Sequence, residues 1–119
     1  MTIRECYDII GADFDGVKGR LLSEERVQKF TLRFLDDDTF ATLEKAYAAQ
    51  DWQTAFRAAH TLKGASANLG FTALSVSSSA LTETLRSGSP TAETPALYEK
   101  TTADYKALVA GIESFKASL

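Results

Sequence analysis

Apolar residues recur every three or four positions along almost the whole chain, and no stretch alternates convincingly with period two. This pattern favours helices and argues against a sheet. The length of 119 residues predicts a single domain with enough chain to bury a core of its own. We therefore expect an all-α protein in which each helix buries one apolar face.

Helix-capping residues and glycines divide the helical pattern of the N-terminal residues into a helix and a loop. Residues 2–10 are expected to form a helix, because Thr2 and Glu5 have the spacing of a capping box and Gly11 stops the pattern. Residues 11–19 hold three glycines and two aspartates, and we expect them to form a loop. The N-terminal region is thus predicted to begin with a short helix and a connection.

A second N-terminal helix and four further helices account for the rest. Ser23 is the cap candidate for the helix of residues 23–36, and residues 37–117 hold the longest and most regular helical patterns. Short connections make consecutive helices antiparallel neighbours. We predict one domain over residues 1–119, an up-down-up-down four-helix bundle with one or two extra N-terminal helices on its end or side.

Charge and cysteine content narrow the function classes. The net charge of −3 and the pI of about 5.1 argue against a nucleic-acid partner and against an anionic membrane surface. Cys6 is the only cysteine, so neither a disulfide framework nor a cysteine-rich metal site is expected. We find no membrane span and no stretch of signal-peptide type, and we expect a cytoplasmic protein.

The only histidine, His60, lies on a helix predicted to begin after Asp51 and to end at Gly70. At about 100° per residue, it falls roughly 100–120° from the centre of that helix's apolar stripe. The same spacing places it on one surface patch with three other residues. We call this set the His60 patch: His60, Lys63, Gly64 and Ala67.

The residue types in this patch suit phosphoryl transfer. Histidine is largely neutral at physiological pH, so a ring nitrogen is free to attack phosphorus. The Lys63 ammonium can stabilise the oxygens of the transferring group, and Gly64 leaves space for another protein. The alternatives are a solvated histidine, an ordinary surface lysine, and a glycine that relieves crowding between helices. With no carboxylate or cysteine beside it, His60 makes a poor metal site.

Residues 59–70 have the sequence AHTLKGASANLG, which closely resembles the signature of histidine-containing phosphotransfer (HPt) domains of two-component phosphorelays. The likeness extends over about residues 20–115. It implies a four-helix bundle without kinase activity of its own, which carries phosphate on a histidine between receiver-domain aspartates. It thus implies a phosphocarrier rather than an enzyme.

The resemblance also implies roles for single residues. His60 would be phosphorylated, Lys63 would steady the phosphoryl group, and Gly64 would leave room for the receiver. Arg86 lies where some family members have a basic residue near the site. The family often has a Gln or Glu that fixes the histidine tautomer, whereas this chain has Thr82 there, with Glu83 adjacent. Thr82, Glu83 or a water would then orient the ring, or it is held less firmly.

The sequence therefore predicts a phosphorelay intermediate that takes a phosphoryl group on His60 from one receiver and passes it to another. The expected partners are response-regulator receivers, with a hybrid histidine kinase as a further candidate. No cofactor is expected on this chain, and Mg²⁺ is expected on the receiver only. Direct phosphorylation by a histidine kinase and an unphosphorylated helical adaptor stay open. A hydrolase would need Thr82 or Glu83 as the partner of His60.

The sequence also leaves the molecular context open. Met1 favours a free-standing protein, although a domain excised from a hybrid kinase would look the same. Monomer and dimer are equally compatible with the sequence.

Overall fold

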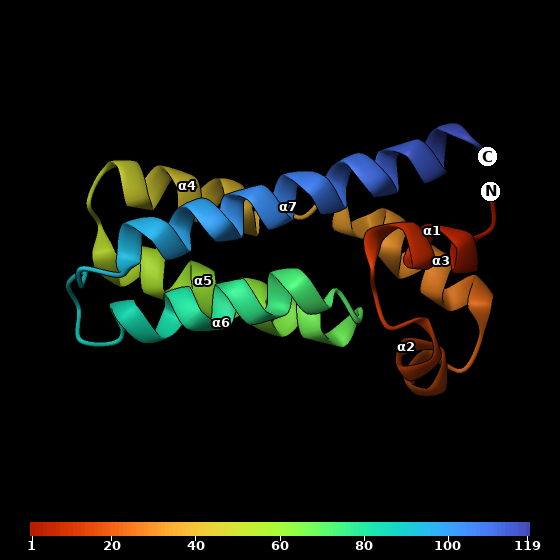
Figure 1. Ribbon diagram of the computed structural model, residues 1–119, viewed down its shortest axis with the longest axis horizontal. Helices are drawn as coiled ribbons and strands as arrows, with labels where there is room; N and C mark the ends of the chain where they lie inside the picture. The colour runs from red at the N-terminus through yellow and green to blue at the C-terminus, as the bar shows by residue number, and fades with distance from the viewer.

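The computed structural model describes residues 1–119 as seven helices without a strand (Figure 1). The predicted all-α helical bundle is confirmed. The helices are α1 (Ile3–Ile10), α2 (Phe14–Leu21), α3 (Glu24–Phe34), α4 (Thr39–Ala48), α5 (Trp52–Asn68), α6 (Thr72–Leu85) and α7 (Thr94–Ala117).

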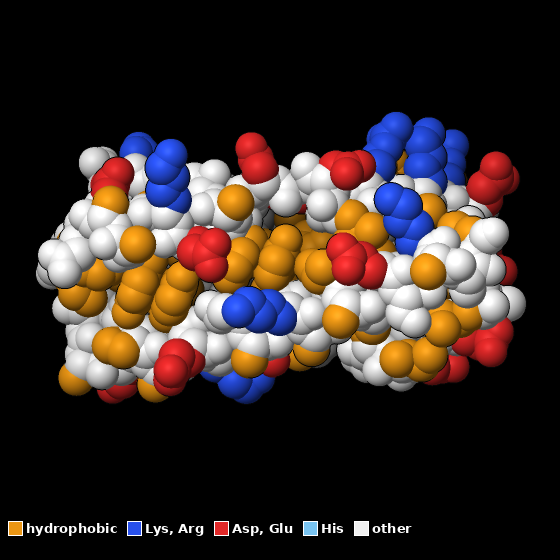
Figure 2. All heavy atoms as spheres, turned by 90° about the horizontal axis from the view of Figure 1, so that it is seen from above, with side chains coloured by type: hydrophobic (Ala, Val, Ile, Leu, Met, Phe, Trp, Pro, Cys, Tyr) orange, Lys and Arg blue, Asp and Glu red, His pale blue; other side chains and the backbone are white.

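Helices α4 to α7 lie along the long axis of the molecule, and the colour gradient runs in opposite directions along successive helices (Figure 1). Helix α5 packs against both α4 and α6, and α6 packs against α7. Aromatic stacks close the ring between α4 and α7: Phe40 on Tyr105 at 4.1 Å and Tyr47 on Tyr98 at 3.7 Å between ring centroids. Apolar side chains are visible along this face in Figure 2.

The three N-terminal helices gather at one end of the bundle, beside the C-terminal half of α7 (Figure 1). Helix α1 packs on α7, and α2 packs on α3. The Tyr7 hydroxyl of α1 donates to the carbonyl of Leu69 at 2.7 Å and pairs with the Thr31 hydroxyl of α3 at 3.0 Å. The N-terminal helices are therefore tied to the end of the histidine-bearing helix.

Helix α2 corrects the expectation of a loop over residues 11–19. The Asp13 side chain caps it by accepting from the Gly16 amide at 3.1 Å, and Phe14 and Val17 are buried beneath it. Burial and capping thus offset the low helix propensity of its two glycines. Three helices precede the bundle, one more than predicted.

Both predicted ends of the histidine-bearing helix are confirmed. The Asp51 side chain accepts from the Thr54 amide at 3.2 Å, and Gly70 follows the helix with φ of +71°. A Cβ on Gly70 would lie 2.4 Å from Val17 and 2.7 Å from the Asp13 carbonyl. The end of α5 therefore lies directly against α2. No helix in the chain has both the length and the apolarity to cross a membrane.

Candidate functional site

Helix α5 buries one face and presents His60 on another. Five small or apolar residues of this helix face the core, whereas His60 is exposed. The buried residues of α5 are Ala55, Ala58, Ala59, Leu62 and Ser66.

Phe56 lies beside His60, one helical turn earlier. The two rings are nearly parallel, with centroids 6.3 Å apart and planes inclined by 20°. Phe56 is half-buried: it packs against the hydrophobic core and also lies beside the histidine. The spacing of four residues from His60 was the signal that could have revealed this contact.

The two residues considered for orienting the His60 ring are both engaged elsewhere. Thr82 is fully buried, and its hydroxyl donates to the Ser78 carbonyl of its own helix at 2.7 Å. The Glu83 carboxylate receives hydrogen bonds from Arg86 at 3.0 and 2.8 Å. The chain therefore offers the ring an aromatic neighbour but no hydrogen bond to either nitrogen.

Glu83 and Arg86 nevertheless belong to the surroundings of His60. The Arg86 guanidinium lies over the Phe56 ring, 5.4 Å from its centroid. The hydrogen bonds from Arg86 lower the pKa of the Glu83 carboxyl, and the nearby charges of Lys63 and His60 add to this effect. The same ion pair raises the pKa of Arg86. Two cationic side chains, Lys63 and Arg86, therefore lie near the exposed imidazole.

Gly64 faces open space. A Cβ added there would meet no atom of the chain within 4 Å beyond its own helix backbone and chain neighbours, so helix packing does not account for this glycine. It opens onto a hollow of about 410 Å³ between α5 and α6, in which Val76 is 65% exposed. We call this the α5–α6 hollow, lined by Lys63, Gly64, Ala67, Ser75, Val76, Ser79, Ala80 and Glu83.

The structure thus brings together three of the four residues of the His60 patch on the wall of this hollow, directly beside His60. Lys63 is half-buried, whereas Gly64 and Ala67 are exposed. Sequence reasoning missed Val76. It lies in a run of small residues on α6, and its exposure depends on how α6 is rotated against α5.

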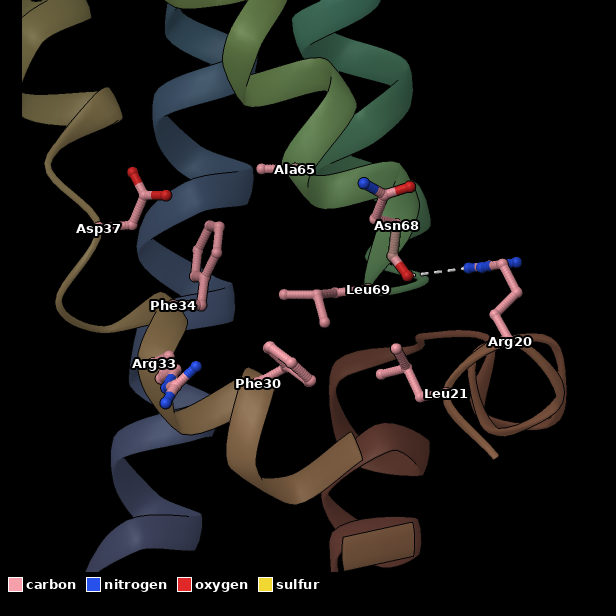
Figure 3. Close-up of a pocket in the computed structure, with 9 residues that line it drawn as sticks. All are labelled: Arg20, Leu21, Phe30, Arg33, Phe34, Asp37, Ala65, Asn68 and Leu69. Carbon is pink, nitrogen blue, oxygen red and sulfur yellow. Dashed lines mark hydrogen bonds between the residues drawn. The ribbon is translucent and has the colours of Figure 1, made fainter. Parts of the chain in front are cut away.

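A second hollow, of about 450 Å³, lies where α2 and α3 meet the C-terminal end of α5 (Figure 3). Arg20 points to that end and donates to the carbonyls of Ala67 and Asn68 at 3.1 and 3.0 Å. It therefore satisfies the Asn68 carbonyl at the helix end and adds a second hydrogen bond to the Ala67 carbonyl, which also accepts from the Gly70 amide. This hollow does not include His60. Its lining residues are Arg20, Leu21, Phe30, Arg33, Phe34, Asp37, Ala65, Asn68 and Leu69.

The chain brings no three His, Cys, Asp or Glu side chains together as potential metal ligands. The groups that the site offers for chemistry are a solvent-facing imidazole, two cationic side chains and an open surface beside a glycine.

Comparison with known proteins identifies the family. Residues 35–116 match the family model of the Hpt domain. No curated protein and no solved structure matches the sequence. Hpt domains act with receiver domains and kinases in two-component signalling, as phosphocarriers and not in general as catalysts. Since the match covers well over half of the 119 residues, this chain belongs to the histidine-containing phosphotransfer family.

Proposed function

We propose that this protein is a phosphorelay intermediate. It accepts a phosphoryl group on His60 from the aspartyl phosphate of one receiver domain and passes it to the aspartate of another. The observation that carries the proposal is the exposed His60 beside a glycine that opens onto a hollow and that no packing within the chain requires. A location in the cytoplasm stays a prediction.

The transfer step needs one bond to form and one to break. A ring nitrogen of His60 attacks phosphorus, a P–N bond forms, and the P–O bond to the receiver's aspartate breaks, leaving a carboxylate. The imidazole then loses the proton of its other nitrogen to water. Passing the group on reverses these events at a second receiver.

The protein contributes position and charge to this step. Negative charge gathers on the phosphoryl oxygens in the transition state, where Lys63 and Arg86 can stabilise it. Mg²⁺ is proposed to arrive with the receiver, which supplies the carboxylates that this cation prefers. The α5–α6 hollow gives the receiver room to bring its aspartate within reach of the ring.

Phosphoryl transfer from isolated receivers tests the proposal. Mg²⁺-loaded, phosphorylated receiver domains from the same organism are mixed with the wild-type chain and with His60→Gln. We expect an acid-labile, alkali-stable label on the wild type and none on the variant, whose circular dichroism stays unchanged because His60 is exposed.

The same assay separates the alternatives. Label from a purified histidine kinase but from no receiver would indicate a direct kinase substrate. Label that persists in His60→Gln would refute the assignment of His60. If neither donor labels the chain, the adaptor hypothesis takes precedence.

A further inference from the structure

The Glu83–Arg86 ion pair differs in its geometry from the other arginine–carboxylate pairs of the chain. Two guanidinium nitrogens donate to the two carboxylate oxygens, at 3.0 and 2.8 Å, so the pair is bidentate. By contrast, the Arg4–Asp15 pair on the N-terminal helices is a single long contact at 3.6 Å. A bidentate fork is the geometry with which arginine also binds phosphate.

The position of this pair connects it to the phosphorylation site. Arg86 rests on the face of Phe56, and Phe56 in turn stacks against His60. Glu83 lines the α5–α6 hollow together with Lys63 and Gly64. The guanidinium therefore binds a carboxylate and lies over the same aromatic ring that stacks against the histidine.

We propose that Glu83 is a positioning residue that competes with the phosphoryl group on His60 for the Arg86 guanidinium. This inference rests on the proposed function. In the unphosphorylated protein the Glu83 carboxylate binds the Arg86 guanidinium. When His60 carries a phosphoryl group, that dianion is a stronger partner, and the Arg86 guanidinium turns toward it from its place over the Phe56 ring.

The competition has a consequence for a carrier. An interaction that stabilises phosphohistidine more than the transition state of its hydrolysis slows that hydrolysis, and Glu83 weakens such an interaction by occupying Arg86. A carrier must release its phosphoryl group to the next receiver, so a competing carboxylate keeps the group transferable. The lifetime of the phosphohistidine should therefore depend on Glu83, but only while Arg86 is present.

The test is a double-mutant cycle on phosphohistidine lifetime. The chain is labelled with phosphoramidate, a small donor that needs no receiver: its P–N bond breaks, ammonia leaves and the P–N bond to the ring forms. Decay is then followed by phosphorus NMR, as water attacks phosphorus, the ring nitrogen takes up a proton and inorganic phosphate is released. The variants are Glu83→Gln, Arg86→Gln, the double variant, and Asp15→Asn as a distant control.

We expect Glu83→Gln to lengthen the lifetime about two- to fivefold, the scale of one exposed ion pair. Arg86→Gln should shorten it, and Glu83→Gln should have no effect in the Arg86→Gln background. Asp15→Asn should match the wild type, because Asp15 lies on α2 at the N-terminal end of the molecule. The Arg86 Nε–H signal of the wild type should shift on labelling.

Three results would overturn the proposal. One is an unchanged lifetime in Glu83→Gln. Another is an effect of Glu83→Gln that persists undiminished without Arg86, since the carboxylate would then act by charge repulsion alone. The third is an Arg86 signal that labelling leaves in place. Failure of wild-type His60 to take label would instead count against the proposed function itself.

Discussion

At Gly64, the missing side chain is the feature that matters. A glycine inside a helix costs about 1 kcal/mol relative to alanine. Packing does not explain it, since an added Cβ would meet nothing within 4 Å. The chain therefore carries an unfavourable residue on its surface beside His60, and the space it leaves suits the approach of another protein.

Two substitutions at Gly64 should separate stability from transfer. Gly64→Ala should raise the free energy of unfolding by roughly 0.5–1 kcal/mol and leave transfer close to that of the wild type. Gly64→Gln should keep the helix but lower the single-turnover transfer rate about tenfold or more, because it holds the receiver away from His60. Urea unfolding and rapid-quench transfer measure the two effects.

The control for this pair is Gly19→Ala, on α2, where an added Cβ also meets nothing. It should stabilise the fold without changing transfer. Wild-type transfer rates in Gly64→Gln would show that the open space at Gly64 does not serve the receiver.

The His60 patch could be predicted because its four residues share one helix, and the helical period alone places them on one face. The contacts that Glu83, Arg86 and Val76 make with α5 could not be predicted from the sequence. They depend on how α6 is rotated and shifted against α5, which side-chain packing decides. For the same reason, the sequence alone could not identify which residue orients the His60 ring.

At the scale of elements, α2 shows where local patterns fail. Gly16 and Gly19 lower its helix propensity, and its sequence offers few apolar residues. It forms because Phe14 and Val17 are buried and because Gly70 lets α5 end directly against it. These contacts are tertiary, so no window of sequence contains them.

Tyr7 joins three elements, and its ionisation should test that junction. Its side chain is fully buried, and burial raises the pKa of Tyr7 to about 12. An unfolded tyrosine has a pKa of about 10. In the folded state Tyr7 therefore keeps its hydroxyl proton to higher pH than in the unfolded state. The contribution of this proton to the free energy of unfolding is complete below pH 10 and is lost as the pH rises toward 12.

We expect the free energy of unfolding to fall by roughly 2 kcal/mol between pH 10 and pH 12 because of Tyr7. Urea titrations at several pH values measure it. Tyr7→Phe removes the ionisable group, so its pH slope should be smaller by this amount, whereas the other tyrosines affect both proteins alike. Identical slopes would mean that the Tyr7 hydroxyl is solvated in the folded state.

For the whole molecule, the hydrophobic core extends further toward the N-terminus than the region that matches the family. The match begins at residue 35, yet one cluster of 21 buried apolar residues runs through both the bundle and the helices before it. Ile3, Cys6 and Val27 are as much part of this core as Leu81 or Ile112. The N-terminal helices should therefore unfold together with the bundle, as one cooperative unit.

The chain has one tryptophan and one cysteine, and they report on its opposite ends. Trp52 begins α5 at the far end of the bundle, where it contacts Tyr47, and Cys6 is fully buried in α1. In urea, Trp52 fluorescence and pulsed iodoacetamide labelling of Cys6 should give the same midpoint, with a small free thiol correcting for denaturant effects on the reaction. Cys6 labelling at lower urea would mean that the N-terminal helices detach first. Gly111→Ala sharpens the test: its Cβ would clash with the Ile10 side chain at the seam between α1 and α7, and in a cooperative unit both midpoints must shift by the same amount.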